Sequence, residues 1–166
     1  MQSHITTQQL RLQFIFAVVL VLVSSCASVP ERTCTSSTFS VRITKGICFG
    51  RCPAWEATIR GDRSVHFRPI LHIEPPIEKF GTIDDATLCA IADAIDSTKA
   101  FETEFSYEMI PDAPKTAITI EKDGRSTTVT WYIAPPESMR KLHDLLVTAT
   151  YDRRDTDLHA SSSEQR

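Results

Sequence analysis

The sequence lacks any dense block of basic residues. Its 166 residues include 18 lysines and arginines against 21 aspartates and glutamates, which gives a formal net charge of −3. Proteins that bind nucleic acids or anionic surfaces through electrostatics carry their positive charge in clusters. The composition therefore argues against a nucleic-acid partner, and we expect none.

Familiar catalytic motifs are also missing. There is no G-x-S-x-G nucleophile turn, no H-E-x-x-H pair and no glycine-rich phosphate loop, the patterns that mark several large enzyme classes. The five histidines are scattered along the chain. We expect no catalytic residues and no cofactor, and the sequence leans against an enzyme without deciding the question.

A run of about twenty apolar residues, which a membrane-spanning helix requires, is absent as well. The longest apolar stretch is "LQFIFAVVLVLV" at residues 12–23. It has the length of the apolar core of a secretory signal. It ends in Val23-Ser24-Ser25-Cys26, which resembles the lipobox of bacterial lipoproteins.

The lipobox resemblance implies cleavage before Cys26, a diacylglycerol group on its sulfur, and a fatty acyl chain such as palmitate on its amino group. Several acyl chains hold a protein stably on a bilayer. Ala27 follows Cys26, instead of the aspartate that often retains such lipoproteins in the inner membrane. The resemblance therefore implies an outer-membrane lipoprotein facing the periplasm. An ordinary secretory signal cut near Ala27 or Ser28, and an uncleaved anchor, are the alternatives.

Composition divides the chain into four parts. We expect a signal peptide at 1–25, a lipidated polar tether at 26–38, one domain at 39–151, and a disordered polar tail at 152–166. The predicted domain is long enough to form a single hydrophobic core.

Period-two alternation of apolar and polar residues predicts the strands of this domain. The alternating segments are "FSVRIT" from 39, "WEATIRG" from 55, "VHFRPI" from 65, and the two arms of "AITIEKDGRSTTVTWYI" from 117. Asp123-Gly124 lies between those arms and is typical of a two-residue hairpin turn.

Apolar residues at helical spacing predict two helices. The first lies in "TIDDATLCAIADAIDSTKAF", with Thr82 as a plausible N-cap, and the second in "PPESMRKLHDLLVTAT". The element order is β-β-β-α-β-β-α. It favours an α+β two-layer sandwich, in which an antiparallel sheet of about five strands carries both helices on one face.

The cysteines beyond Cys26 are Cys34, Cys48, Cys52 and Cys89. The bacterial envelope is oxidising, so we expect these to be paired. Cys48 and Cys52 are close enough in sequence to close a tight turn as a disulfide. Cys34 and Cys89 would then form a second bridge, with a free buried Cys89 as the alternative.

Two other readings of the Cys48/Cys52 pair stay open. As an exchangeable dithiol it would be redox-active, although a strand rather than an activating helix follows it. As a Cu(I) site it would use both thiolates and a histidine such as His66. We assign no metal site on this pattern.

The segment "CFGRCPAWEATIRGDRSVHF" resembles the signature of a bacterial family of lipoproteins and secreted proteins catalogued as domain of unknown function 6438 (DUF6438). The family motif reads Cys-Phe-Gly-x-Cys-Pro-x-Tyr. The matching residues here are Cys48, Phe49, Gly50, Cys52 and Pro53, with Trp55 in place of the tyrosine. The resemblance covers about 39–150 and implies no particular activity.

Together these features lead us to expect a non-catalytic binding or structural module of the bacterial envelope. It would be held on the membrane by its amino-terminal lipid. An envelope protein or peptidoglycan would be its partner. The rival hypothesis is a periplasmic redox or Cu(I)-handling protein that uses Cys48 and Cys52.

Overall fold

The computed structural model describes residues 38–156 and 158–160. The predicted signal peptide, the lipidation residue Cys26, Cys34 and almost all of the tether lie outside this part of the chain. The described elements are β1 (Phe39–Lys45), β2 (Ala54–Arg60), β3 (Ser64–Leu71), β4 (Lys79–Thr82), α2 (Asp85–Thr98), β5 (Thr116–Lys122), β6 (Arg125–Trp131), α3 (Glu137–Val147), the π-helical turn η1 (Thr148–Asp152) and β7 (His159–Ala160).

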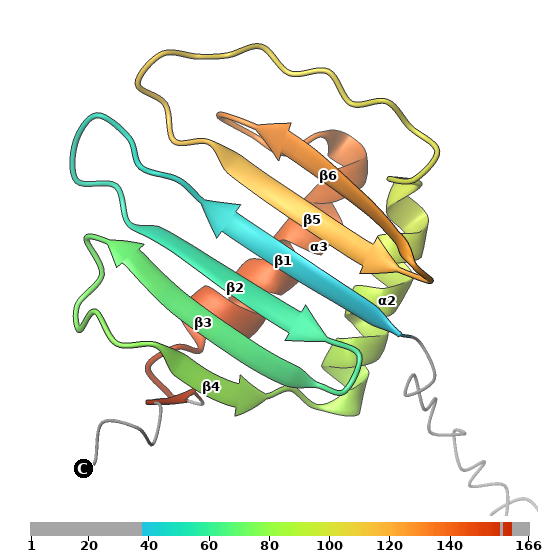
Figure 1. Ribbon diagram of the computed structural model, residues 1–166, viewed down its shortest axis with the longest axis horizontal. Helices are drawn as coiled ribbons and strands as arrows, with labels where there is room; N and C mark the ends of the chain where they lie inside the picture. The colour runs from blue at the N-terminus through green and yellow to red at the C-terminus, as the bar shows by residue number, and fades with distance from the viewer. Residues whose placement is uncertain (1–37, 157, 161–166) are drawn as a thin grey trace, which may run out of the picture. The chain divides into compact units, whose positions relative to one another are not determined.

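All the described strands form one antiparallel sheet in the order β6-β5-β1-β2-β3-β4-β7. Helices α2 and α3 lie against one face of it, and the other face is left open (Figure 1). The predicted α+β two-layer class is confirmed. The strand count is higher than the expected five, because β4 has only four residues and β7 only two.

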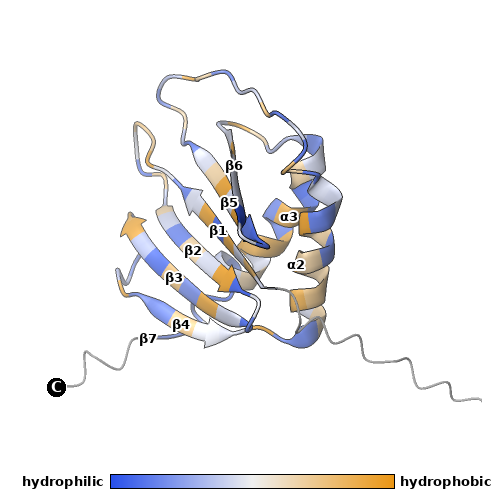
Figure 2. Ribbon diagram, turned by 45° about the vertical axis from the view of Figure 1, so that its right-hand side comes forward, coloured by the Kyte–Doolittle hydropathy of each residue, from blue (hydrophilic) through white to orange (hydrophobic). Residues whose placement is uncertain are grey.

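The core lies between the sheet and the helices because each element has one apolar face. In β1, Phe39, Val41 and Ile43 are buried, while the residues between them are at least partly exposed. Figure 2 shows the same alternation of apolar and polar positions along the strands. Leu88 of α2 and Leu142 of α3 are fully buried against this surface. Burial of each such side chain contributes about 1.5–3 kcal/mol.

Strand register defines the two ends of the sheet. At one end Lys45 pairs with Trp55 and with Thr116, Ala54 pairs with Leu71, and Thr116 pairs with Trp131. We call this the loop end, because the segments 46–53, 72–78, 107–115 and 132–136 gather there. The 99–115 loop reaches it from the opposite end of the β5–β6 hairpin, where the Ala100 carbonyl accepts a hydrogen bond from Thr127. At the other end Phe39 pairs with Lys122, so the chain enters the domain opposite the loop end (Figure 1).

Helix α2 begins two residues later than its predicted N-cap implies. Asp84, not Thr82, is the N-cap, and its Oδ1 accepts a 2.6 Å hydrogen bond from the Thr87 backbone N–H. An aspartate at this position satisfies one of the unpaired amides of the first turn and carries the charge that the helix N-terminus favours. Thr82 instead ends β4, where it pairs with Ser64.

The segment from 152 onward was predicted to be a disordered tail, and part of it has regular structure. Asp152 ends η1, and β7 pairs with β4. The Lys79 ammonium of β4 donates to the Arg154 carbonyl at 2.7 Å and to Asp155 Oδ1 at 2.9 Å. This hydrogen bond lowers the pKa of the Asp155 carboxyl. Residues 157 and 161–166 lie outside the described range.

Within the described residues, no helix combines the length and the apolar character needed to cross a membrane.

Candidate functional site at the loop end

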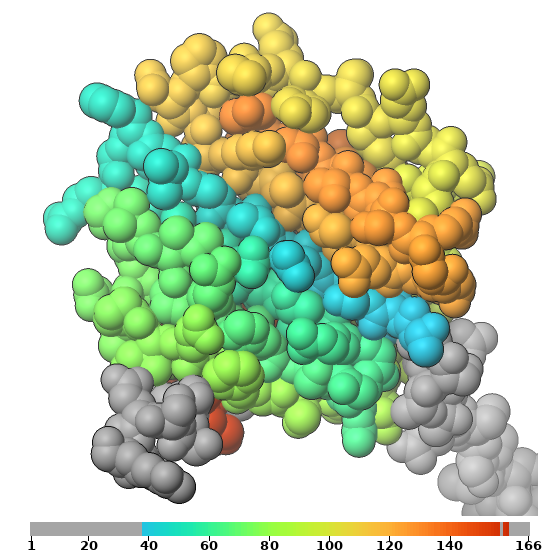
Figure 3. Space-filling model, viewed as in Figure 1, coloured from blue at the N-terminus to red at the C-terminus, as the bar shows by residue number. Residues whose placement is uncertain are grey.

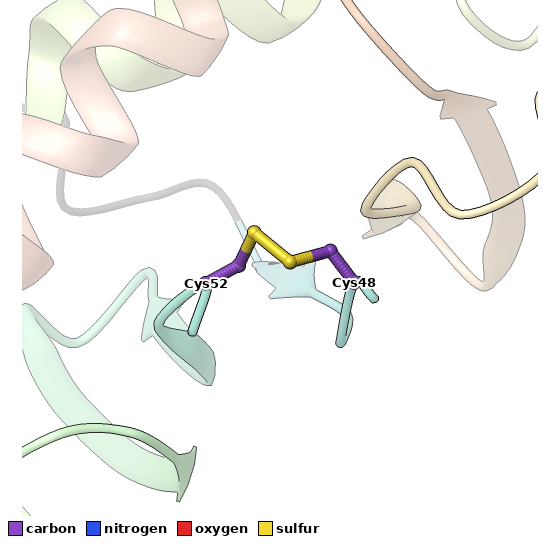
Figure 4. The surroundings of a disulfide bond; sticks show 2 residues. All are labelled: Cys48 and Cys52. Atoms are coloured by element: carbon purple, nitrogen blue, oxygen red, sulfur yellow. A yellow bond between two sulfur atoms is a disulfide. The ribbon is translucent and has the colours of Figure 1, made fainter. Parts of the chain in front are cut away.

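The loop between β1 and β2 is closed by a disulfide. Cys48 and Cys52 are bonded, with their Cα atoms 5.8 Å apart (Figure 4). Gly50, inside the closed ring, has φ +145°, a backbone conformation that residues with a Cβ rarely adopt. Glycine is therefore required for the bend between the two cysteines, and the predicted pairing of Cys48 with Cys52 is confirmed.

Two backbone hydrogen bonds hold this loop to the segment that leads into β5. The Gly46 N–H donates to the Lys115 carbonyl at 2.7 Å, and the Phe49 N–H donates to the Asp112 carbonyl at 3.3 Å. A Cβ added at Gly46 would lie 3.1 Å from the Lys115 carbonyl oxygen. The close contact between the two backbone segments therefore favours glycine at this position. The disulfide-closed loop and the 99–115 loop thus form one connected surface.

Most of the exposed large apolar side chains of the described chain lie at this end. Phe49 is 89% exposed and Ile133 is 79% exposed. The set comprises Ile47, Phe49, Ile70, Leu71, Tyr107, Met109 and Ile133. Phe80, on β4, is the exposed large apolar residue that lies elsewhere. In Figure 3 the side chains of the 46–53 loop project from the edge of the molecule.

Charged residues of one sign predominate among these loops. Exposed acidic residues of the segments 46–53, 72–78, 107–115 and 132–136 are Glu74, Glu78, Glu108 and Asp112, whereas their exposed basic residues are Arg51 and Lys115. The apolar side chains are therefore surrounded by net negative charge. Such a surface complements an apolar patch with basic groups around it.

A small cavity lies beside the disulfide-closed loop, between the sheet and α3. Its volume is about 220 Å³, and it is lined by Ile43, Lys45, Pro53, Trp55, Thr116, His143, Val147, Tyr151 and Asp152. These residues come from β1, β2, β5, α3 and η1, and Pro53 comes from the loop between β1 and β2. Sequence reasoning missed this set, because the residues are separated by up to about a hundred positions and carry no shared motif.

The histidine considered as a third copper ligand is remote from the cysteine pair. His66 lies in the middle of β3, where its ring stacks on Phe80 at 4.5 Å and its Nε2 lies 3.0 Å from Glu78. Leu71, at the loop end, is five residues further along the strand, a distance of about 17 Å. No cluster of three or more His, Cys, Asp or Glu side chains suited to a metal ion occurs among the described residues.

Cys89 is partly buried on α2 and is also disulfide-bonded. Its predicted pairing with Cys34 falls outside the described residues. Of the predicted motif residues, Phe49 lies inside the closed loop and Pro53 directly follows it. Trp55 is buried at the start of β2, with its ring stacked 5.3 Å from Tyr151. The motif thus specifies both the loop and one wall of the cavity.

The open face of the sheet is polar and largely paired with itself. Arg68 donates to Glu56 at 3.2 Å, Thr44 donates to the same carboxylate at 3.5 Å, and the hydroxyls of Thr119 and Thr128 are 2.9 Å apart. Such cross-strand pairs stabilise a solvated sheet face. The exposed apolar area that marks an interaction site is at the loop end instead.

The family described as "Domain of unknown function (DUF6438)" matches residues 39–150. This range covers strands β1 to β6, helices α2 and α3 and most of η1, and it confirms the DUF6438 family as the prediction named it. No curated protein matches the chain.

Proposed function

Because the chain belongs to the DUF6438 family, whose description assigns no activity, we propose its function from the geometry of the loop end. The protein is a non-catalytic, lipid-anchored binding module of the bacterial envelope. It presents the loop end to a partner protein in the periplasm. The observation that carries this proposal is the concentration of exposed apolar side chains at the end of the sheet opposite the point where the chain enters.

Distance supports a periplasmic partner over the membrane itself. A flexible thirteen-residue chain, the length of the predicted tether at 26–38, has a root-mean-square span of about 20 Å. Strand β1 has seven residues and is about 24 Å long, and the loops extend beyond it. A domain anchored through Phe39 therefore favours an orientation in which its loop end points away from the bilayer.

A second copy of the chain fits less well than a different protein. Two copies anchored in the same membrane leaflet would both direct their loop ends away from it. A symmetric contact between two loop ends requires the domains to point toward one another. The net negative charge around the apolar side chains also opposes such a contact, because like charges would meet. The fitting partner is a protein with an apolar patch and basic groups around it.

Site-specific photocrosslinking in the envelope tests this proposal. A photoreactive phenylalanine analogue at position 49 should yield an adduct with one protein, whereas the same analogue at position 123, at the opposite end of the sheet, should not. Added wild-type protein should compete for the adduct. Protein carrying Phe49→Ser should compete about ten- to a hundredfold less well, since burial of a phenylalanine contributes about 1.5–3 kcal/mol.

A charge variant sharpens the same experiment. Glu108→Lys should weaken the adduct at position 49, and Glu121→Lys, on the open face of β5, should leave it unchanged. Adducts with lipid, adducts with a second copy, or equal adducts from positions 49 and 123 would each overturn the proposal.

The rival function, a redox or Cu(I)-handling protein, requires Cys48 and Cys52 to be free thiols in the cell. Alkylation of thiols before lysis, followed by mass measurement, separates the two functions. Labelled cysteines at 48 and 52 would favour the rival, whereas an intact disulfide favours the binding module.

A further inference from the structure

The cavity beside the disulfide-closed loop is suited to a ligand in its own right. Its floor is apolar, because Ile43 and Trp55 are buried and Val147 completes the wall. The Trp55 ring stacks on Tyr151 with the ring planes 23° apart. The Arg154 guanidinium also lies 4.0 Å from the centre of the Tyr151 ring, and Trp55 is only 2% exposed. The two rings therefore close the floor of the cavity instead of offering open faces to a ligand.

The π-helical turn η1 supplies the side of the cavity that faces the sheet. Five residues, Thr148–Asp152, adopt this wide turn directly after α3. The Thr150 hydroxyl of η1 donates to the Leu146 carbonyl of α3 at 2.7 Å. Wide turns of this kind are rare and occur frequently at functional sites. Here the turn brings both Tyr151 and Asp152 into the cavity lining.

Opposite charges line the cavity without pairing. Lys45 and Asp152 both belong to its wall. In the part of the chain that the structure describes, neither side chain makes an ion pair, and the two do not pair with each other. His143 is oriented by a 2.9 Å contact of its Nδ1 with Asp144 and by an edge-on contact with Trp131. Its Nε2 makes no hydrogen bond to the described residues.

The volume limits the ligand to a small molecule. A water occupies about 30 Å³ of liquid, so a cavity of about 220 Å³ holds roughly seven waters, or one molecule of similar size. A ligand with a carboxylate can accept hydrogen bonds from Lys45 and the Thr116 hydroxyl. A ligand with an ammonium can donate to Asp152. A small apolar group can contact Pro53 and Val147, which are only partly buried.

We propose that this cavity binds a small zwitterion, a free α-amino acid with a short apolar side chain. Its carboxylate lies toward Lys45, its ammonium toward Asp152, and its side chain toward Pro53 and Val147, the partly exposed apolar residues of the lining. The site is separate from the partner surface, since none of its lining residues belongs to the set of exposed apolar residues at the loop end.

Nuclear magnetic resonance of the full chain tests the proposal. The sequence has two tryptophans, Trp55 and Trp131, so two indole N–H signals report on the cavity and on its neighbour. Alanine should shift the Trp55 signal in a saturable manner. Propionate lacks the ammonium and isopropylamine lacks the carboxylate, and each should bind at least about tenfold more weakly, the loss expected for one charge-assisted hydrogen bond.

Matched variants separate a built site from a general charge effect. Lys45→Met and Asp152→Asn should each raise the dissociation constant for alanine about tenfold. Lys141→Met and Asp123→Asn, which remove the same charges away from the cavity, should leave it unchanged. Phe49→Ser should also leave it unchanged, so failure of the partner proposal does not imply failure here.

Three results would overturn the zwitterion site. Propionate binding as tightly as alanine would make it an anion site. Unchanged affinity in the Lys45 and Asp152 variants would place the ligand elsewhere. No saturable shift with millimolar alanine would leave the cavity without this ligand.

Discussion

Asp84 is the single residue with the clearest local role in stability. Its carboxylate caps α2 through the Thr87 amide. We predict that Asp84→Ala lowers the free energy of unfolding by about 1 kcal/mol at neutral pH. Asp84→Asn should cost less, because asparagine is also a favourable N-cap. Urea denaturation of the three proteins measures both differences.

The same cap gives a direction for pH dependence. The hydrogen bonds from Thr87 lower the pKa of the Asp84 carboxyl below its usual value of 3.8. The stabilisation is therefore fully present above the pKa of the unfolded chain and is lost as the pH falls through the lower folded value. Because Asp84 is exposed, solvent screens the effect. The gap between wild type and Asp84→Asn should narrow below about pH 4, and a gap that widens there would contradict this assignment.

Single residues also show what sequence can and cannot predict about the site. The pairing of Cys48 with Cys52 was predictable, because a tight turn can bring two cysteines four positions apart to the Cα–Cα distance that a disulfide requires. Lys45, His143 and Asp152 were not, because their proximity depends on how β1, α3 and η1 pack. The exposure of the Phe49 side chain was not predictable either, because phenylalanine is more often buried and its exposure here depends on the tertiary structure.

At the scale of an element, the β5–β6 hairpin rests on its turn. Asp123 and Gly124 both have positive φ, 52° and 74°, as a two-residue hairpin turn requires. A Cβ added at Gly124 meets nothing within 4 Å. The free-energy cost of a larger residue there therefore comes only from the positive φ of the backbone. We predict that Gly124→Ala lowers the free energy of unfolding by about 1–2 kcal/mol, as thermal or urea denaturation would measure.

Asp123→Gly is the matched control for this turn. Glycine adopts positive φ readily, so this substitution keeps the turn conformation. The free energy of unfolding should therefore change by less than in Gly124→Ala. An equal loss in both variants would mean that the turn geometry does not govern the hairpin.

Long elements followed their sequence patterns, and short ones did not. Strands β1, β2, β3, β5 and β6 have seven or eight residues each, and the alternation within them is long enough to predict them. Strand β4 has only four residues, one of them Gly81, too few to establish a period. Strand β7 was not predictable because it forms by pairing with the edge of β4. The turn η1 was not predictable because the sequence after α3 has no local feature that indicates a π-helical turn.

At the scale of the whole molecule, the lipid anchor is the prediction with the widest consequence. Cys26→Ala should abolish lipid attachment, so the protein leaves the membrane fraction or accumulates as an uncleaved precursor. Cys34→Ala should keep the membrane location, because that cysteine lies outside the lipobox. Cell fractionation and intact mass measure both. An unchanged mass and unchanged membrane retention in Cys26→Ala would rule out the anchor.

The two-layer class was predictable because every long element has one apolar face. The strand order was not, since alternation places residues on a face but does not say which strands become neighbours. The central position of β1 depends on its pairing with β5 across seven residue pairs. The loop end, and with it the candidate site, follows from this order.

That β1–β5 pairing also bears on how the chain reaches its native state. Strands β1 to β4 follow one another in space as in sequence, whereas β5 begins about seventy residues after β1 ends. Contacts between such distant segments form slowly, because a long loop must close first. In a chain made from its amino end, β1 remains an unpaired edge until β5 emerges. The interval before that pairing is therefore the time at which this protein is most exposed to aggregation.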